Sequence, residues 1–162
     1  MFERLPAGAA VFLDANVLIY HAVESRPSCA LLLRRIATRE IRGYTSTVVL
    51  SEVFHRLVLS EIAVTFRLPS ARAALNLVRR HPEHLPALTV AHQFLAKMPT
   101  LRIRVLPVRW REITLAMAAS RRYGLLANDA LIIATMQAHR LTHLASNDAD
   151  FRRVPTITLW RP

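Results

Sequence analysis

The aspartates of this chain stand beside apolar runs, where buried strands are expected to end or helices to begin. Asp14 follows the run VFL, and Asp129 precedes the run ALIIATM. Asp148 and Asp150 come shortly after THLAS, where an ordinary acidic turn is the alternative interpretation. A carboxylate near buried elements is costly to desolvate unless a cation or hydrogen-bond donors compensate for it. No lysine lies near these acids in the sequence, although arginines remain possible partners.

Glu52 and Asp129 each allow a functional and a purely local interpretation. Glu52 lies within the apolar, helix-like run VVLSEVFHRLVL, which either presents it to a site or leaves it paired with Arg56 on the surface. Such an i,i+4 pair stabilises a helix by only a few tenths of a kcal/mol. Asp129 follows Asn128, and this dipeptide suits a helix start, with Asn128 as the cap and Asp129 near the positive end of the helix dipole.

The elements that must position these acids alternate between strands and helices. The hydrophobic pattern predicts strands at 11–13, 44–46, 101–108, from 142 and at 157–160. It predicts helices from 16, from 28 to about 41, and at 48–59, 70–80, 87–98, 109–122 and 128–140. Thr47 is the expected cap of the third helix, and Gly124 is expected to end the helix over 109–122.

This alternation favours a fold of the α/β class, with three layers, α/β/α, and a central, mostly parallel sheet, because parallel neighbours need crossovers that helices supply. In such sheets the ligand crevice lies outside the carboxyl ends of the strands. Asp14 and Asp148 both follow apolar strands. Both carboxylates are therefore expected to open into that crevice.

Length and composition favour one ordered domain over residues 1–162, with 52% hydrophobic residues. The segment at about 60–100 is helical but less regular, with prolines at 69, 82, 86 and 99. No apolar run is long enough for a membrane span, and acids near the N-terminus argue against a signal peptide. We therefore expect a soluble, cytoplasmic protein without a membrane partner, in which Cys29 packs in the core.

The formal net charge of +11 favours a polyanionic partner such as nucleic acid. Lys97 is the only lysine, so a coding bias toward arginine is the alternative explanation. His81, His84 and His92 raise the question of a zinc site. Their turn-like flank, HPEHLP, holds no cysteine, and the spacing favours structural or exposed histidines.

Four segments in order resemble the motifs of the PIN-domain ribonucleases, most clearly those of the VapC-type toxins of VapBC toxin–antitoxin systems. They are FLDANVLIY, TSTVVLSEV, YGLLANDALIIATM and LASNDADF. The resemblance implies an acidic quartet that is both catalytic and metal-ligating, formed by Asp14, Glu52, Asp129 and Asp148. It also implies accessory roles for three further residues, namely Asn16, Ser46 and Asp150, the last of which is a possible substitute for Asp148.

A member of that family would be a metal-dependent endoribonuclease that uses Mg²⁺ or Mn²⁺, hard cations suited to carboxylate ligands. The expected reaction is in-line attack by a metal-bound water on an RNA phosphodiester, with Asp14 bridging if two ions bind. The resemblance implies 3′-hydroxyl and 5′-phosphate products, a cognate antitoxin and a homodimer. The segment at about 60–100 is longer than in a compact toxin of this type.

Other classes fit less well. Aspartyl-phosphate phosphatases need a second aspartate two residues after the first, where this chain has Asn16. Phospho-acceptor receiver domains need an acidic pair after the first strand and a late lysine, and both are absent. The alternative that remains is a catalytically silent PIN-like module that binds RNA or protein.

Overall fold

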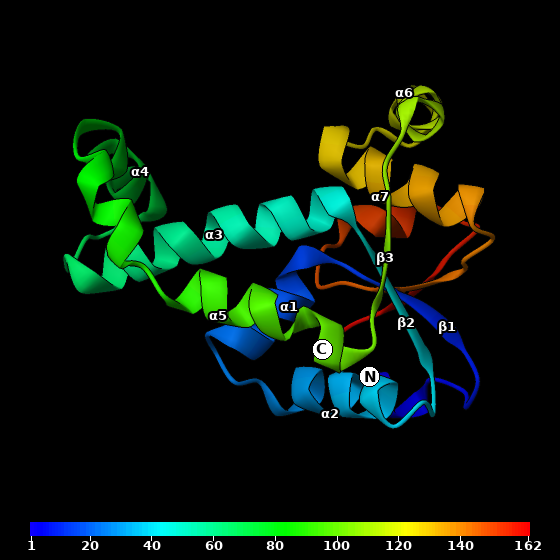
Figure 1. Ribbon diagram of the computed structural model, residues 1–162. Coiled ribbons are helices and arrows are strands. Elements are labelled where there is room, and N and C mark those ends of the chain that lie inside the picture. The colour runs from blue at the N-terminus through cyan, green and yellow to red at the C-terminus, as the bar shows by residue number, and fades with distance from the viewer.

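A parallel sheet forms the centre of the computed structural model, which describes residues 1–162 (Figure 1). Its five strands run in the order β3-β2-β1-β4-β5, and all neighbouring pairs are parallel. The strands are β1 (Ala10–Leu13), β2 (Arg42–Ser46), β3 (Arg104–Leu106), β4 (His143–Ala145) and β5 (Thr158–Trp160). The predicted α/β class and α/β/α layering are confirmed, and the sheet is parallel throughout.

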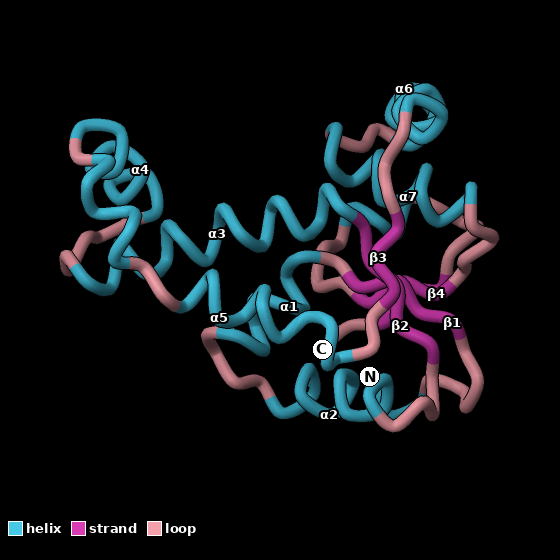
Figure 2. Tube along the Cα trace, in the orientation of Figure 1, coloured by secondary structure: helices cyan, strands magenta, loops and turns pink.

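Helices cover both faces of this sheet (Figures 1 and 2). One layer contains α1 (Ala15–Ala22) and α2 (Pro27–Ala37), and the other contains α6 (Trp110–Tyr123) and α7 (Ala127–Ala138). Short 3-10 helices lie at Phe2–Arg4 (η1), Met98–Leu101 (η3) and Asp150–Arg153 (η4). None of the helices has both the length and the apolar character needed to cross a membrane.

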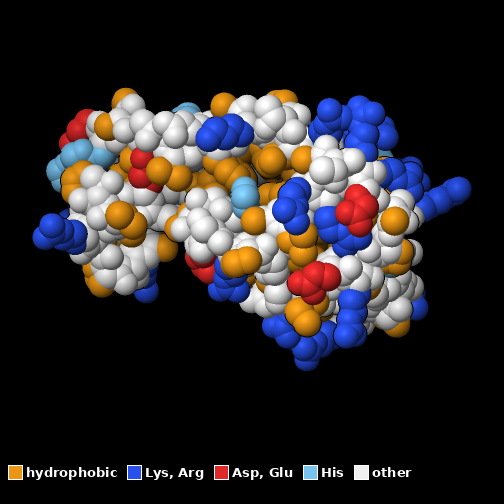
Figure 3. Space-filling model, turned by 90° about the horizontal axis from the view of Figure 1, so that it is seen from below, with side chains coloured by type: hydrophobic (Ala, Val, Ile, Leu, Met, Phe, Trp, Pro, Cys, Tyr) orange, Lys and Arg blue, Asp and Glu red, His pale blue; other side chains and the backbone are white.

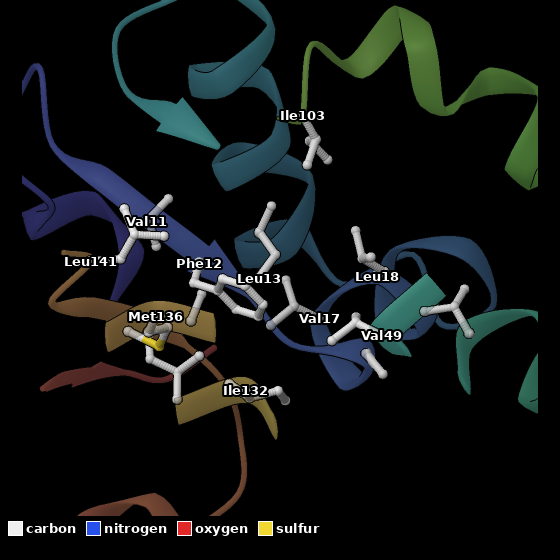
Figure 4. Close-up of a cluster of buried hydrophobic side chains, with 14 of the residues drawn as sticks. Val11, Phe12, Leu13, Val17, Leu18, Val49, Ile103, Ile132, Met136 and Leu141 are labelled. Atoms are coloured by element: carbon white, nitrogen blue, oxygen red, sulfur yellow. The ribbon is translucent and has the colours of Figure 1, made fainter. Parts of the chain in front are cut away.

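The central strand β1 forms the middle of the main hydrophobic core (Figure 4). Phe12 and Leu13 are fully buried, and they lie among side chains of α1 and α7, including Val17 and Ile132. A strand covered by helices on both faces has a continuously apolar sequence rather than one that alternates between apolar and polar residues. The core therefore fixes the end of β1, and with it the position of Asp14.

Helix α3 (Thr47–Thr65) begins at the sheet and extends away from it (Figure 1). Its far end packs with α4 (Ala71–Arg80) and η2 (Pro82–Ala87), and α5 (Val90–Lys97) returns toward the sheet. We call the far end of α3 together with residues 66–88, which include α4 and η2, the arm. The arm has its own small core, formed by Leu59, Ile62, Ala74 and Leu88. The helices predicted for the irregular middle segment are confirmed, and the assignment of one domain stays a prediction.

Several predicted helix ends need correction. Ser46, not Thr47, caps α3, because its hydroxyl accepts a hydrogen bond from Val49 N at 3.3 Å. Asn128 does not cap α7, which begins at Ala127 after Leu126 without a side-chain cap. Gly124, in the left-handed conformation with φ 63°, ends α6 as predicted.

Two predicted ranges were too long. Helix α2 ends at Ala37 rather than near residue 41, since Arg39 adopts a left-handed conformation with φ 63°. The strand predicted over 101–108 is confined to β3, where three residues pair with Tyr44, Thr45 and Ser46. The residues at the start of the predicted range end η3 instead, where Arg102 adopts a left-handed conformation with φ 56°.

Candidate active site

Asp14 is the buried acid at the carboxyl end of the central strand. Its side chain is 7% exposed, and Oδ1 accepts a hydrogen bond from Ala15 N at 2.6 Å at the start of α1. Burial raises the pKa of Asp14 to about 6, with smaller raising contributions from the charges of Glu52 and Asp129. Hydrogen bonds from Ser146 and Ala15 oppose this rise. Asp14 forms no ion pair with Lys or Arg.

Ser146 connects Asp14 with the acidic turn that follows β4. Its buried hydroxyl donates to Asp14 Oδ2 at 2.6 Å and accepts from Asp148 N at 3.0 Å and from Asn16 Nδ2 at 3.1 Å. Asn16 Nδ2 also donates to Asp14 Oδ2, and Asn16 Oδ1 accepts from Asn147 N at 3.0 Å. The strand register explains this convergence, since Leu13 pairs with Ala145 and the next residues emerge side by side.

Glu52 comes to the same edge of the sheet from the first half of α3. Its carboxylate accepts a hydrogen bond from Asn128 Nδ2 at 3.3 Å, which links α3 to the start of α7. Arg56 also lies 3.6 Å from Glu52, so the surface pair considered from the sequence is present. The two interpretations coexist, because Glu52 pairs with Arg56 while its charge also acts on Asp14 and Asp129.

Asp129 lies in the first turn of α7, as predicted. Partial burial raises its pKa to about 6, and the charges of Asp148, Asp150 and Glu52 add to the rise. No arginine or lysine pairs with it. Asp129 therefore belongs to a group of mutually repelling carboxylates rather than to an isolated helix start.

Asp148 and Asp150 form the acidic turn after β4, and they differ in their partners. Asp148 Oδ1 accepts a hydrogen bond from Asp150 N at 2.8 Å, which shapes the turn. Asp150 forms an ion pair with Arg153, whose Nη2 lies 2.8 Å from Asp150 Oδ1. This pairing favours Asp148 as the fourth acid, because its carboxylate has no cationic side chain beside it.

Ser46 lies at the end of β2 and is 1% exposed. Its side-chain hydrogen bond caps α3, the helix that carries Glu52. Thr45 beside it donates to Leu13 O at 3.0 Å and ties β2 to the end of β1. Ser46 thus helps to orient Glu52, and a direct role at the acids stays a prediction.

The side chains around this site suit a hard divalent cation. The acids offer only carboxylate oxygens, and Asp14 and Asp129 lack a compensating cationic side chain. Mg²⁺ and Mn²⁺ prefer such oxygen ligands. A bound cation would also offset the repulsion that raises the pKa of Asp14 and of Asp129.

Sequence reasoning missed Ser146 and misassigned Asn128. Ser146 stands directly before the acidic turn, but its place beside Asp14 depends on β1 and β4 being neighbours. Asparagine often caps helices, yet the side-chain amide of Asn128 donates a hydrogen bond to Glu52 on another helix. A search for polar residues directly after each predicted strand would have found Ser146.

Replacing Ser146 by alanine tests its role at Asp14. We expect the pKa of Asp14 to rise further, because the hydrogen bond that favours its ionised form is lost. Catalytic activity at neutral pH should fall by about 10-fold or more, as is typical for groups that orient metal ligands. The measurement is the pH profile of activity, with Ser70→Ala, which removes an exposed helix cap, as the control. An unchanged profile would show that Ser146 does not tune Asp14.

This chain is similar to known proteins in sequence and in fold. The sequence matches the PIN domain family over residues 11–157, and this chain belongs to the PIN-domain family. The match includes β2, β3, β4 and all of β1 except its first residue, and it ends just before β5, so it covers every acid of the candidate site.

Named relatives add detail to this assignment. Ribonuclease VapC2 of Methanocaldococcus jannaschii is 27% identical over 153 residues, which cover 92% of this chain and 91% of the relative. The structure of VapC20 of Mycobacterium tuberculosis, a toxin that cleaves the sarcin–ricin loop, has a TM-score of 0.61 at 18% identity and covers 94% of this chain and 99% of that one. A toxin–antitoxin complex from Klebsiella pneumoniae gives a TM-score of 0.59 at 18% identity, covering 91% and 95%.

Proposed function

We propose that this chain is a VapC-type endoribonuclease that hydrolyses RNA phosphodiesters with Mg²⁺ or Mn²⁺. The observation that carries the proposal is the convergence of Asp14, Glu52 and Asp129 at one sheet edge, where each charge influences another. Membership of the PIN-domain family and the similarity to Ribonuclease VapC2 support the same activity.

The cation would be held by the acidic quartet, Asp14, Glu52, Asp129 and Asp148. When bound there, it supplies positive charge to the scissile phosphate and lowers the pKa of a water. The remaining work belongs to the chain itself. Ser146 and Asn16 hold the Asp14 carboxylate in one orientation, and Asn128 does the same for Glu52.

The surface of the molecule suits an RNA substrate. Lys and Arg side chains are spread over the body on the face seen in Figure 3. The formal net charge of +11 would attract phosphates, and each neutralised phosphate releases condensed counterions. Affinity for RNA should therefore fall as salt concentration rises.

Cleavage of a mixed pool of single-stranded RNA tests the proposal. We expect Mg²⁺ or Mn²⁺ to support cleavage and EDTA to abolish it, because the chain offers no other evident nucleophile at the site. Undiminished cleavage in EDTA would contradict the role of the metal. RNA binding without cleavage at any concentration of either cation would instead support the silent module that the sequence left open.

The proposal extends to partners. The similar toxin–antitoxin complex from Klebsiella pneumoniae suggests a cognate antitoxin, which would place a basic side chain among the acids. The chain would then act as a cytoplasmic toxin. The homodimer stays a prediction, and large apolar side chains exposed at Trp110, Met117 and Leu126 offer a surface for it. Light scattering after gel filtration measures the mass.

Expression of the chain alone tests the toxin assignment. We expect it to arrest growth and co-expression of the antitoxin to restore growth. A variant with Asp14→Asn should be harmless, because it lacks the proposed activity. The absence of both a growth defect and a neighbouring small gene would contradict the toxin role but leave the nuclease proposal standing.

A further inference from the structure

The arm carries a group of metal-ligating side chains far along the chain from the acidic quartet. His81, Glu83 and His84 each offer one ligand atom, and these three atoms all lie within 4.8 Å of one another. Histidine side chains also gather near an acidic one at the end of the arm in Figure 3. The structure separates His92 from this group, since its Nδ1 lies 3.1 Å from Leu88 O and its ring packs edge-on against Phe54.

We propose that the turn at 81–84 is a second metal site, with His81, Glu83 and His84 as protein ligands for Zn²⁺ or a similar transition-metal ion. Two imidazoles and one carboxylate are a donor set that zinc accepts, with water in the fourth position. The site differs in chemistry from the acidic quartet, because imidazole nitrogen suits zinc, copper and nickel, whereas Mg²⁺ prefers oxygen.

The spacing of the three side chains requires little adjustment. His81 Nδ1 lies 3.0 Å from Glu83 Oε1. Ligand atoms on a tetrahedral zinc with bonds of 2.0–2.1 Å stand about 3.4 Å apart. From a separation of 4.8 Å or less, the ligand atoms need to approach by only about 1.5 Å at most. Small rotations of the three side chains about their χ angles, within their preferred rotamers, can supply this change.

The surrounding structure orients the site. His81 joins α4 to η2, and Glu83 and His84 lie in the first turn of η2, so a short stretch of backbone holds the three ligands together before any metal binds. The ring of Phe66, at the end of α3, packs on His84 with centroids 4.5 Å apart. His81 follows the last residue of α4, where the negative end of the helix dipole favours a cation.

Both positive and negative side chains lie at this end of α4. Arg79 and Arg80 belong to its last turn and oppose a cation, although Arg80 Nε donates to Asn76 O one turn back. Glu83 supplies negative charge at the site, and its Oε1 lies 3.0 Å from His81 Nδ1.

The metal would act as a cross-link that stabilises the arm. The core of the arm consists of only four buried residues, Leu59, Ile62, Ala74 and Leu88. A small core of this kind gives limited stability by itself, and small folding units often use metals as additional cross-links. A metal on the turn at 81–84, with Phe66 against His84, would join the end of α3 to α4 and η2.

Titration with Zn²⁺ in an excess of Mg²⁺ tests the site, because under the proposed function the Mg²⁺ occupies the acidic quartet. The binding is measured by calorimetry, and hydrogen exchange is measured over residues 66–90. We expect one Zn²⁺ per chain and slower exchange in the arm. His81→Gln and Glu83→Gln should each lower the affinity at least 10-fold, whereas His92→Ala, which changes a histidine outside the site, should leave it unchanged.

The variants must remain folded for this comparison. His81 and Glu83 have side chains 52% and 63% exposed, so both variants should melt at the wild-type temperature without metal. Zinc that binds both Gln variants with wild-type affinity would overturn the proposal, as would the absence of zinc binding to the wild type. Slower exchange at the acidic quartet rather than in the arm would also overturn it. None of these outcomes depends on RNA cleavage.

Discussion

Replacing Asp129 by asparagine is expected to lower RNA cleavage by about 100-fold or more, a loss typical of groups that stabilise charge developing in a transition state. The same change should leave the metal-free protein as stable as the wild type or more stable. Burial is the largest cause of the raised pKa of Asp129, and the charges of Asp148, Asp150 and Glu52 add to it, so the four carboxylates repel one another. Removing one charge should stabilise the fold by on the order of 1 kcal/mol.

The response to metal separates this expectation from a purely local role. A ligand that binds only the folded state raises the melting temperature by mass action. Mg²⁺ should therefore stabilise the wild type more than Asp129→Asn. If Asp129 served only the helix start, asparagine would cost a few tenths of a kcal/mol of dipole interaction and leave the metal response unchanged.

Thermal melts in EDTA and in Mg²⁺ measure both effects. Glu24→Gln is the control, because Glu24 is an exposed acid paired with Arg26 on the surface. It should keep full activity and the full Mg²⁺ shift. An Asp129→Asn protein that melts lower than wild type in EDTA and keeps the full Mg²⁺ shift would remove Asp129 from the site.

The sequence predicts the layers of this fold because its hydrophobic pattern is regular where the core is continuous. The run before Asp14 belongs to the central strand, and Phe12 and Leu13 are buried as such a run requires. The rule that ligands bind at the carboxyl ends of parallel strands then places Asp14 and Asp148 together. The structure agrees, since Ser146 hydrogen-bonds with both residues.

The details that the sequence could not predict depend on which strands and helices are neighbours. Ser146 reaches Asp14 because β4 lies beside β1, although the two residues are 132 positions apart in the chain.

 The order β3-β2-β1-β4-β5 has to be known before this contact can be expected. Asn128 is a similar case, because its preference for helix caps is local, whereas its hydrogen bond to Glu52 joins two helices that are distant in sequence. Local preference therefore predicted the wrong partner for Asn128.

The pH dependence of stability is the second large effect that the site predicts. Burial raises the pKa of Asp14 from 3.8 to about 6, and the pKa of Asp129 is raised to about 6 as well. At a pH between 3.8 and about 6, Asp14 and Asp129 hold protons in the folded protein that they have released in the unfolded chain. Without metal, the contribution of these two groups to the free energy of unfolding should therefore fall as pH rises from about 4 to about 6, and it should stay low above that window.

The size of this contribution follows from the shift. Each unit of pKa corresponds to about 1.4 kcal/mol. The contribution of Asp14 to the free energy of unfolding should therefore fall by on the order of 3 kcal/mol across the window. The share of Asp129 is smaller, because its partial exposure lets water screen its charge. Glu40, Glu83 and Glu112 have lowered pKa values and act in the opposite direction, so the difference between the wild type and Asp14→Asn is the quantity to measure.

Divalent cations should reverse this dependence, because Mg²⁺ needs ionised carboxylates and competes with the protons on Asp14 and Asp129. The stabilisation by Mg²⁺ should be small at pH 5 and large at pH 7, with apparent affinity changing by about 10-fold per pH unit for each proton released. The acid limb of RNA cleavage should have its midpoint near pH 6 at low Mg²⁺, where burial places both pKa values. The midpoint should move to lower pH as Mg²⁺ increases. Melting curves and cleavage rates at pH 5, 6 and 7 with increasing Mg²⁺ measure this competition, and a midpoint that does not move with Mg²⁺ would show that these carboxyl groups do not bind the metal.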